Sequence, residues 1–131
     1  MKQTLLMDKY PIYTIEVSKA DCVYSTVDEI MTYLKEKIAA DPVAAYIGDF
    51  DHLAHTQSLE EGEVAPDIKA AKVVVFCFGI KLPKPEMLAV RPRSIAVADM
   101  GDSFVLSFME VPMNPINVTM QGWIKELHRV K

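Results

Sequence analysis

The chain has 131 residues, and 50% of them are hydrophobic, which is enough for one packed domain that needs no metal or disulfide to hold it. Its net charge of −4 gives no basic footprint, so we expect no nucleic-acid partner. No apolar run approaches the roughly 18 residues that a membrane span needs, and the first residues lack the apolar core of a signal peptide. We therefore expect a single domain over residues 1–131 that is cytoplasmic and does not contact a membrane, with Cys22 and Cys77 as reduced thiols.

The first part of the chain predicts a strand followed by a helix. Apolar and polar residues alternate from 10 to 17, as in a half-buried strand. Thr26 and Glu29 have the spacing of a capping box, in which two side chains satisfy backbone N–H groups at the start of a helix. Apolar residues then recur on one helical face over 27–38, and Pro42 marks the end of this helix.

The middle of the chain predicts two strands separated by a long connection. Residues 43–50 form the first of them, interrupted near Gly48. Asp51 can cap a short helix inside the connection. The almost continuous apolar run at 73–78 is typical of a central strand that is covered on both faces.

The last part predicts a hairpin and a helix. Strands at 94–99 and 103–111 flank Gly101, which suits a tight turn. We expect Asn114 to cap the final helix, with Pro115 in its first turn. Its apolar stripe consists of Ile116, Met120, Trp123, Ile124 and Leu127.

Together these elements predict an α+β fold. We expect a mostly antiparallel five-stranded sheet with two main helices on one face, in the order strand, helix, four strands, helix. The other face holds small and apolar residues, and we expect a homodimer to cover it; the residues concerned are Ala96, Ala98, Val105 and Met109.

Three segments resemble a bacterial family of uncharacterised small proteins. They are Phe-Asp-His at 50–52, Val-Phe-Cys-Phe-Gly at 75–79 and Leu-Ala-Val-Arg-Pro-Arg-Ser-Ile at 88–95. The family is the group related to domain-of-unknown-function family 302, and the similarity covers most of the chain. The resemblance implies a fold of the TATA-binding-protein-like class and no established reaction. After Gly79 this sequence departs from the better-known members of that family.

The first candidate site is the segment from Asp51 to His55. On a helix, His52 and His55 share one face, and with a carboxylate from Asp49 or Asp51 they can bind zinc or another divalent metal. The metal ligands predicted here are His52, His55 and Asp51. In the alternative interpretation, His52 packs in the core and Asp51 only caps the helix.

The second candidate site is Arg91-Pro92-Arg93, together with Lys81. Two arginines held by a proline can bind a carboxylate or a phosphate through paired hydrogen bonds. The alternative is a pair of structural salt bridges, either within the chain or across a dimer. The methionines and Trp123 either line a cavity beneath the last helix or fill the core.

Charge is unevenly distributed between two segments. Residues 49–67 include six acids and no lysine or arginine, whereas residues 81–93 include four bases and one acid. The two segments leave opposite ends of the strand at 73–78, so they should not meet within one protomer. We hypothesise that they meet across a symmetric dimer.

These patterns favour a binding module over an enzyme. No Gly-rich phosphate loop, Ser-His-Asp order or CxxC pair is present. We expect a homodimeric module, without catalysis or cofactor, that binds a small anionic or apolar molecule or a partner. A metal-dependent enzyme that uses His52 and His55 is one alternative, and a purely structural or regulatory interaction protein is another.

Overall fold

The structure is a computed structural model that describes residues 2–129, so residues 1, 130 and 131 of the predicted domain lie outside it. The strands are β1 (Lys2–Leu6), β2 (Tyr10–Ser18), β3 (Ala45–Asp51), β4 (Ala70–Cys77), β5 (Arg93–Asp99) and β6 (Ser103–Met109). The α-helices are α1 (Val27–Ala40), α2 (His52–Ser58) and α3 (Asn114–Lys125). Two short 3-10 helices are η1 (Lys19–Asp21) and η2 (Pro85–Val90). The α+β class is confirmed.

All six strands form one antiparallel sheet in the order β1-β2-β6-β5-β4-β3. The prediction of five strands was therefore wrong, because β1 was missed. This strand pairs with β2 from Lys2 opposite Thr14 to Leu6 opposite Tyr10. Most of its side chains are exposed, so its sequence carries little of the apolar alternation that reveals a half-buried strand.

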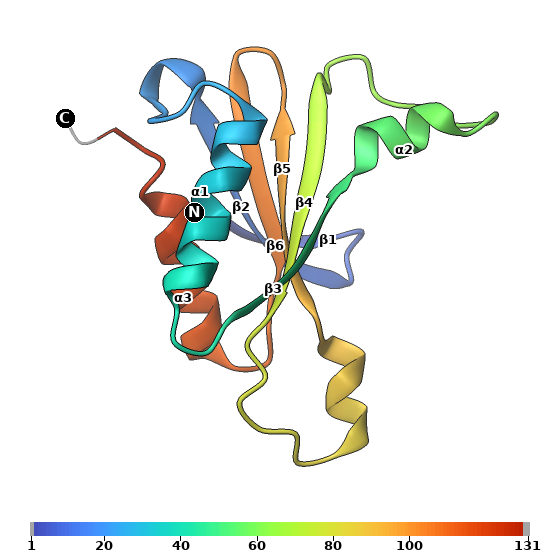
Figure 1. Ribbon diagram of the computed structural model, residues 1–131. Coiled ribbons are helices and arrows are strands. Elements are labelled where there is room, and N and C mark those ends of the chain that lie inside the picture. The colour runs from blue at the N-terminus through green and yellow to red at the C-terminus, as the bar shows by residue number, and fades with distance from the viewer. Residues whose placement is uncertain (1, 130–131) are drawn as a thin grey trace.

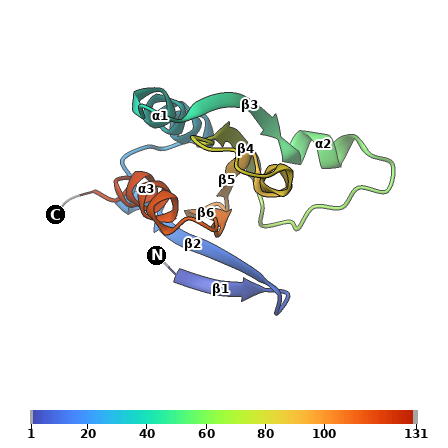
Figure 2. The ribbon, with the colours of Figure 1, turned by 90° about the horizontal axis from the view of Figure 1, so that it is seen from below.

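Helices α1 and α3 lie on the same face of the sheet, as predicted (Figure 1; Figure 2). The core fills the space between these helices and the sheet. The largest fully buried side chains come from both helices and from the four strands β2, β4, β5 and β6, together with one residue two positions beyond α3; they are Phe76, Phe104, Ile30, Leu34, Ile38, Ile95, Leu106, Met120, Ile124, Leu127, Val17 and Val74.

Within residues 2–129, no helix layer covers the opposite face of the sheet. In β4, Val74 and Phe76 are buried beneath the helices, whereas Val73 and Val75, which point to the other face, are only partly buried. Within one protomer, this strand is therefore covered on one face, and not on both faces as predicted. A run of β-branched residues is also compatible with a strand that has one open face.

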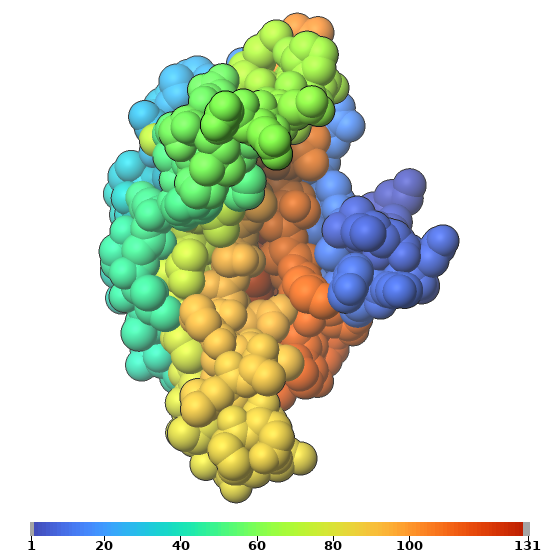
Figure 3. Space-filling view, turned by 90° about the vertical axis from the view of Figure 1, so that its right-hand side faces the viewer, coloured from blue at the N-terminus to red at the C-terminus, as the bar shows by residue number. Residues whose placement is uncertain are grey.

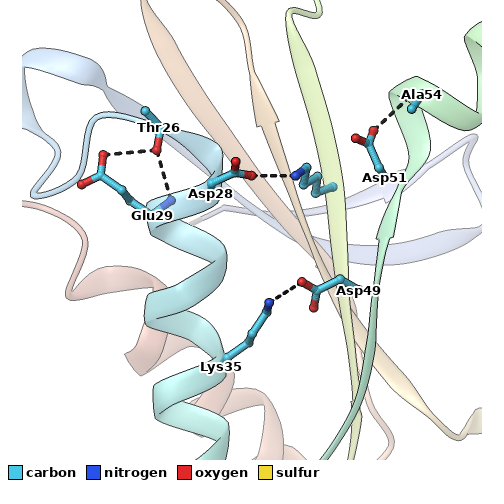
Figure 4. A network of polar contacts seen from close by, with 8 residues as sticks. Thr26, Asp28, Glu29, Lys35, Asp49, Asp51 and Ala54 are labelled. Carbon is cyan, nitrogen blue, oxygen red and sulfur yellow. Dashed lines mark hydrogen bonds and ion pairs between the residues drawn. The ribbon is translucent and has the colours of Figure 1, made fainter.

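Helix α1 begins as predicted, and two ion pairs connect it to the sheet (Figure 4). Thr26 Oγ1 accepts a hydrogen bond of 3.1 Å from the backbone N–H of Glu29. Lys35 Nζ lies 2.5 Å from Asp49 Oδ2 on β3. A second pair joins Asp28 to Lys72 Nζ on β4, at 2.6 Å. These contacts fix α1 over the β3 edge of the sheet.

Helix α3 begins one residue earlier than expected. Met113 occupies the cap position without a side-chain cap, and Asn114 already lies within the helix together with Pro115. The prediction that Asn114 caps the helix was therefore wrong. The asparagine that makes the local backbone contacts is Asn117, one turn further along, as described below.

The predicted irregularity near Gly48 is confirmed. The register of β3 against β4 shifts between Tyr46 and Gly48. Asp51 caps α2, as expected, because its carboxylate accepts a 2.9 Å hydrogen bond from the backbone N–H of Ala54 (Figure 4). No helix in the described part of the chain has both the length and the apolar character to cross a membrane.

Candidate functional site

A cavity of about 580 Å³, called here the end cavity, lies where β4 and β6 end and β5 begins. Three loop segments wall it, and Figure 1 shows them converging at the lower end of the molecule. They are the turn after α1, the long β4–β5 connection that includes η2, and the β6–α3 loop with the first turns of α3. Most of the lining is apolar, and its main side chains are Val43, Phe78, Ile80, Met87, Met113 and Ile116.

Arg93 is the first residue of β5 and lines the end cavity. Its Nη1 donates a 3.0 Å hydrogen bond to the carbonyl oxygen of Val90. Its Nη2 donates to the carbonyls of Met109 and Glu110, at 2.5 and 3.0 Å. The Nε–H is buried and has no partner within residues 2–129. Burial lowers the pKa of Arg93 from its usual value, because water solvates the charged form poorly here.

Arg91 contributes a second guanidinium to the lining. Its Nη2 donates a 2.7 Å hydrogen bond to the carbonyl oxygen of Lys81. A Cβ atom at Gly79 would lie 3.2 Å from Cys77 Sγ and 3.7 Å from Arg91 Nη1, so the guanidinium packs close to this part of the backbone. Gly79 has a φ of +37°, a conformation that glycine adopts readily.

The structure thus brings the three predicted anion-binding residues, Lys81, Arg91 and Arg93, into the lining of one cavity. Each of the four ion pairs found in the described part of the chain uses a lysine as its cation, and none of them involves Arg91 or Arg93. Both arginines are held by backbone carbonyl oxygens instead. Within residues 2–129, the two arginines therefore form no structural salt bridge.

One acidic side chain in the lining was not predicted from the sequence. Asp41, at the end of α1, lines the end cavity, and its Oδ1 accepts hydrogen bonds of 2.9 Å from the N–H groups of Val43 and Ala44. This carboxylate therefore shapes the turn after α1. It is also the only acid among the described residues of the lining, where Lys81, Arg91 and Arg93 are the cations.

A buried asparagine holds the β6–α3 wall in place. Asn117 is 1% exposed, and its Nδ2 donates a 3.0 Å hydrogen bond to the carbonyl oxygen of Val111. Its Oδ1 accepts a 2.8 Å hydrogen bond from the Val111 N–H. The sequence contains a signal for this residue that we did not use: Asn117 shares the apolar stripe of Met120 and Ile124. A polar residue on such a stripe needs a partner when it is buried.

Cys77 also lines the end cavity and is partly buried. A catalytic thiol needs a base within hydrogen-bond reach. The described residues of the lining include no histidine, and the Asp41 carboxylate in it already accepts two backbone N–H groups. The described lining therefore places no histidine beside Cys77.

The predicted metal ligands lie on and just before α2, at the other end of β4 (Figure 1). His52 is exposed, so the interpretation that places it in the core was wrong. Its Nδ1 lies 3.0 Å from Thr56 Oγ1, and its ring centroid is 6.2 Å from that of His55. Within residues 2–129, no group of three or more His, Cys, Asp or Glu side chains is arranged to hold a metal ion. Metal binding by His52, His55 and Asp51 stays a prediction.

A comparison with known protein families gives a match over almost the whole chain. Residues 1–129 match a family of unknown function, DUF6858. The chain belongs to the DUF6858 family. The expectation of a family without an assigned function is thereby confirmed, but no link between DUF6858 and family 302, or the TATA-binding-protein-like class, is shown. No curated protein matches the chain, and no solved structure does.

Proposed function

We propose that this DUF6858 protein is a non-catalytic module that binds a small, largely apolar molecule in the end cavity. The main support is the cavity itself, with about 580 Å³ of space and mostly apolar walls. Ligand sites are typically concave spaces of about 300–1,000 Å³, lined by apolar side chains with a few polar groups that orient the ligand. The end cavity has both properties.

The exposure of the cavity walls also supports ligand binding. The end cavity is partly open to solvent, so a small molecule can enter it and cover its apolar side chains. Ile80 is 76% exposed and Met113 is 55% exposed, although both belong to the lining. Covering such apolar surface stabilises a complex by about 25 cal/mol per Å² that is removed from water.

The test is a fluorescence titration with N-phenyl-1-naphthylamine, an uncharged apolar dye, combined with native mass spectrometry of the freshly purified protein. Ile116→Trp fills the end cavity from α3, and we expect it to abolish the fluorescence increase. Val118→Trp is the matched control, because Val118 lies on the same helix, is 59% exposed and does not line the cavity. Equal dye binding by the two variants would refute the proposal, as would a wild-type protein that does not bind the dye.

We also propose that the protein is a homodimer that associates through the open face of the sheet. The strand register places several exposed apolar side chains on this face, including Phe50 on β3, Met109 on β6 and Tyr10 on β2. Figure 3 shows this side of the molecule, with a hollow between the β1–β2 hairpin, α2 and η2. A second copy offers the same apolar surface and can cover it.

Charge supports one orientation of this dimer. Glu60 and Glu61 follow α2 at one end of the open face, whereas Lys84 precedes η2 at the other end (Figure 1). A two-fold axis in the interface, perpendicular to the strands, brings the acidic end of each protomer to the basic end of its partner. Arg91 and Arg93 contribute less to such a contact, because carbonyls of their own chain already hold them.

Sedimentation equilibrium tests the dimer and its orientation. We expect Lys84→Glu to weaken dimerisation and to make it less sensitive to salt, because one attractive contact becomes repulsive. Adding Glu61→Lys to the same chain should restore the dimer. A wild-type monomer at high protein concentration would refute the dimer, and failure of the second change to rescue would refute this orientation.

A further inference from the structure

The end cavity carries more positive than negative charge. Its lining holds three cationic side chains, Lys81, Arg91 and Arg93, and one anionic side chain, Asp41, which leaves an excess of two positive charges. The first turn of α3 lies in the same wall, and the start of a helix adds a partial positive charge. A cationic surface among apolar side chains favours a ligand with a negatively charged group.

Arg93 contributes a positive charge to this cavity, but few of its N–H groups are free to bind a ligand. Its two Nη atoms already donate to the carbonyls of Val90, Met109 and Glu110. Its Nε–H is buried too deeply for a ligand atom to reach without moving the loop. Arg93 therefore positions the β5 start and the β6–α3 loop, and it makes the electrostatic potential in the cavity more positive.

Arg91 is the cation that can contact a ligand directly. One of its Nη atoms is oriented by the Lys81 carbonyl oxygen at 2.7 Å. Within residues 2–129, Nη1 and Nε of Arg91 make no hydrogen bond, and Nη2 uses only one of its two N–H groups. The second Nη2 N–H and its neighbour on Nη1 or Nε therefore remain as a parallel pair that matches the two oxygens of a carboxylate.

The walls favour a carboxylate over a phosphate. A phosphate monoester usually has two negative charges and three oxygens, and proteins bind it with several backbone N–H groups. Here the residues around the start of α3 include Pro112 and Pro115, which have no N–H to donate. A single guanidinium among apolar side chains is therefore suited to one carboxylate.

We infer that the ligand of the end cavity is an amphipathic monocarboxylate. Its carboxylate binds Arg91, and its apolar body packs against Ile80, Met113 and Ile116. This inference rests on the proposed function, because it names the chemical class of the molecule that the cavity binds.

Isothermal titration calorimetry with matched probes tests this class. Decanoate and decanol have the same apolar chain and differ in the charged group, and decyl phosphate carries the competing anion. We expect decanoate to bind the wild-type protein roughly tenfold to a hundredfold more tightly than decanol, as for one charge-assisted contact. Arg91→Met should remove this preference and leave the affinity for decanol unchanged. Lys125→Met removes an exposed charge at the other end of α3, outside the cavity, and should retain the preference.

The outcomes separate this inference from the proposed function. Equal affinity of the wild-type protein for decanoate and decanol overturns the carboxylate while the apolar cavity stands. A preference for decyl phosphate overturns the carboxylate class, and a preference for decanoate that persists in Arg91→Met overturns the role of Arg91. If no probe binds, including the uncharged dye, the proposed function fails and the inference fails with it. Circular dichroism and thermal unfolding show whether Arg91→Met is folded.

Discussion

Replacing Asn117 by leucine should destabilise the protein and loosen one wall of the end cavity. The change leaves the N–H and C=O of Val111 without their partners, and Val111 is only 5% exposed. Each buried group that loses its hydrogen bond costs about 1–3 kcal/mol. A buried leucine recovers about 1.5–3 kcal/mol of this through its apolar surface. Taking the middle of each range, two unsatisfied groups cost about 4 kcal/mol and the leucine recovers about 2, so the expected net loss is about 2 kcal/mol in the free energy of unfolding.

Urea unfolding followed by the fluorescence of Trp123, the only tryptophan, measures this loss. Val118→Leu is the control on the same helix, and as a surface substitution it should change the free energy of unfolding by less than about 0.5 kcal/mol. We also expect weaker binding of the uncharged dye by Asn117→Leu, since Val111 lines the end cavity. A variant as stable as the wild type would show that the Asn117–Val111 hydrogen bonds do not stabilise the fold.

Three further substitutions test individual contacts. Thr26→Ala removes the α1 cap and should lower the free energy of unfolding by about 1 kcal/mol in urea denaturation. Burial alone would raise the pKa of Asp99, but hydrogen bonds from the Gly101 N–H and from Lys19 hold it below the usual 3.8. Asp99 therefore stabilises the fold above that pH and less as the pH falls through the lowered pKa, so Asp99→Asn should reduce the acid sensitivity of unfolding. Burial and the nearby Glu126 carboxylate raise the pKa of Tyr33 well above 10.0, so an alkaline absorbance titration should show one late tyrosine that Tyr33→Phe removes.

Controls for these substitutions come from the same turns. Ser25→Ala should have little effect, because the Ser25 side chain is not the one that caps α1. Asp102→Asn changes an exposed carboxylate in the hairpin of Asp99 and should leave the acid sensitivity unchanged. If Asp99→Asn is as acid-sensitive as the wild type, its contacts with Lys19 and Gly101 do not contribute as described.

Most of the fold could be predicted because local chemistry decides it. Thr26 and Glu29 mark the start of α1, Asp51 marks the start of α2, and Gly101 marks the last hairpin with a φ of +96°. β1 was missed because it is an edge strand with few buried side chains. Its place in the sheet depends on pairing with β2, which the residues of β1 alone do not indicate.

The candidate site could be predicted only in part. Arg91, Arg93 and Lys81 lie close together in the sequence, so the basic character of their loop was visible. The contribution of Asp41 depends on the way α1 ends beside the β4–β5 loop, and that of Asn117 on a contact across the β6–α3 loop. These segments are far apart in the sequence and meet because of the strand order in the sheet, so no single segment indicates the contact.

The irregular register at Gly48 has a consequence for aggregation. β3 is an edge of the sheet, and an edge strand presents unpaired backbone groups on which another chain can add a strand. The shift between Tyr46 and Gly48 breaks this row of groups partway along the strand. At the opposite edge, β1 is five residues long and begins with a lysine. Neither edge is therefore a good template for uncontrolled growth of the sheet by edge-to-edge pairing between molecules.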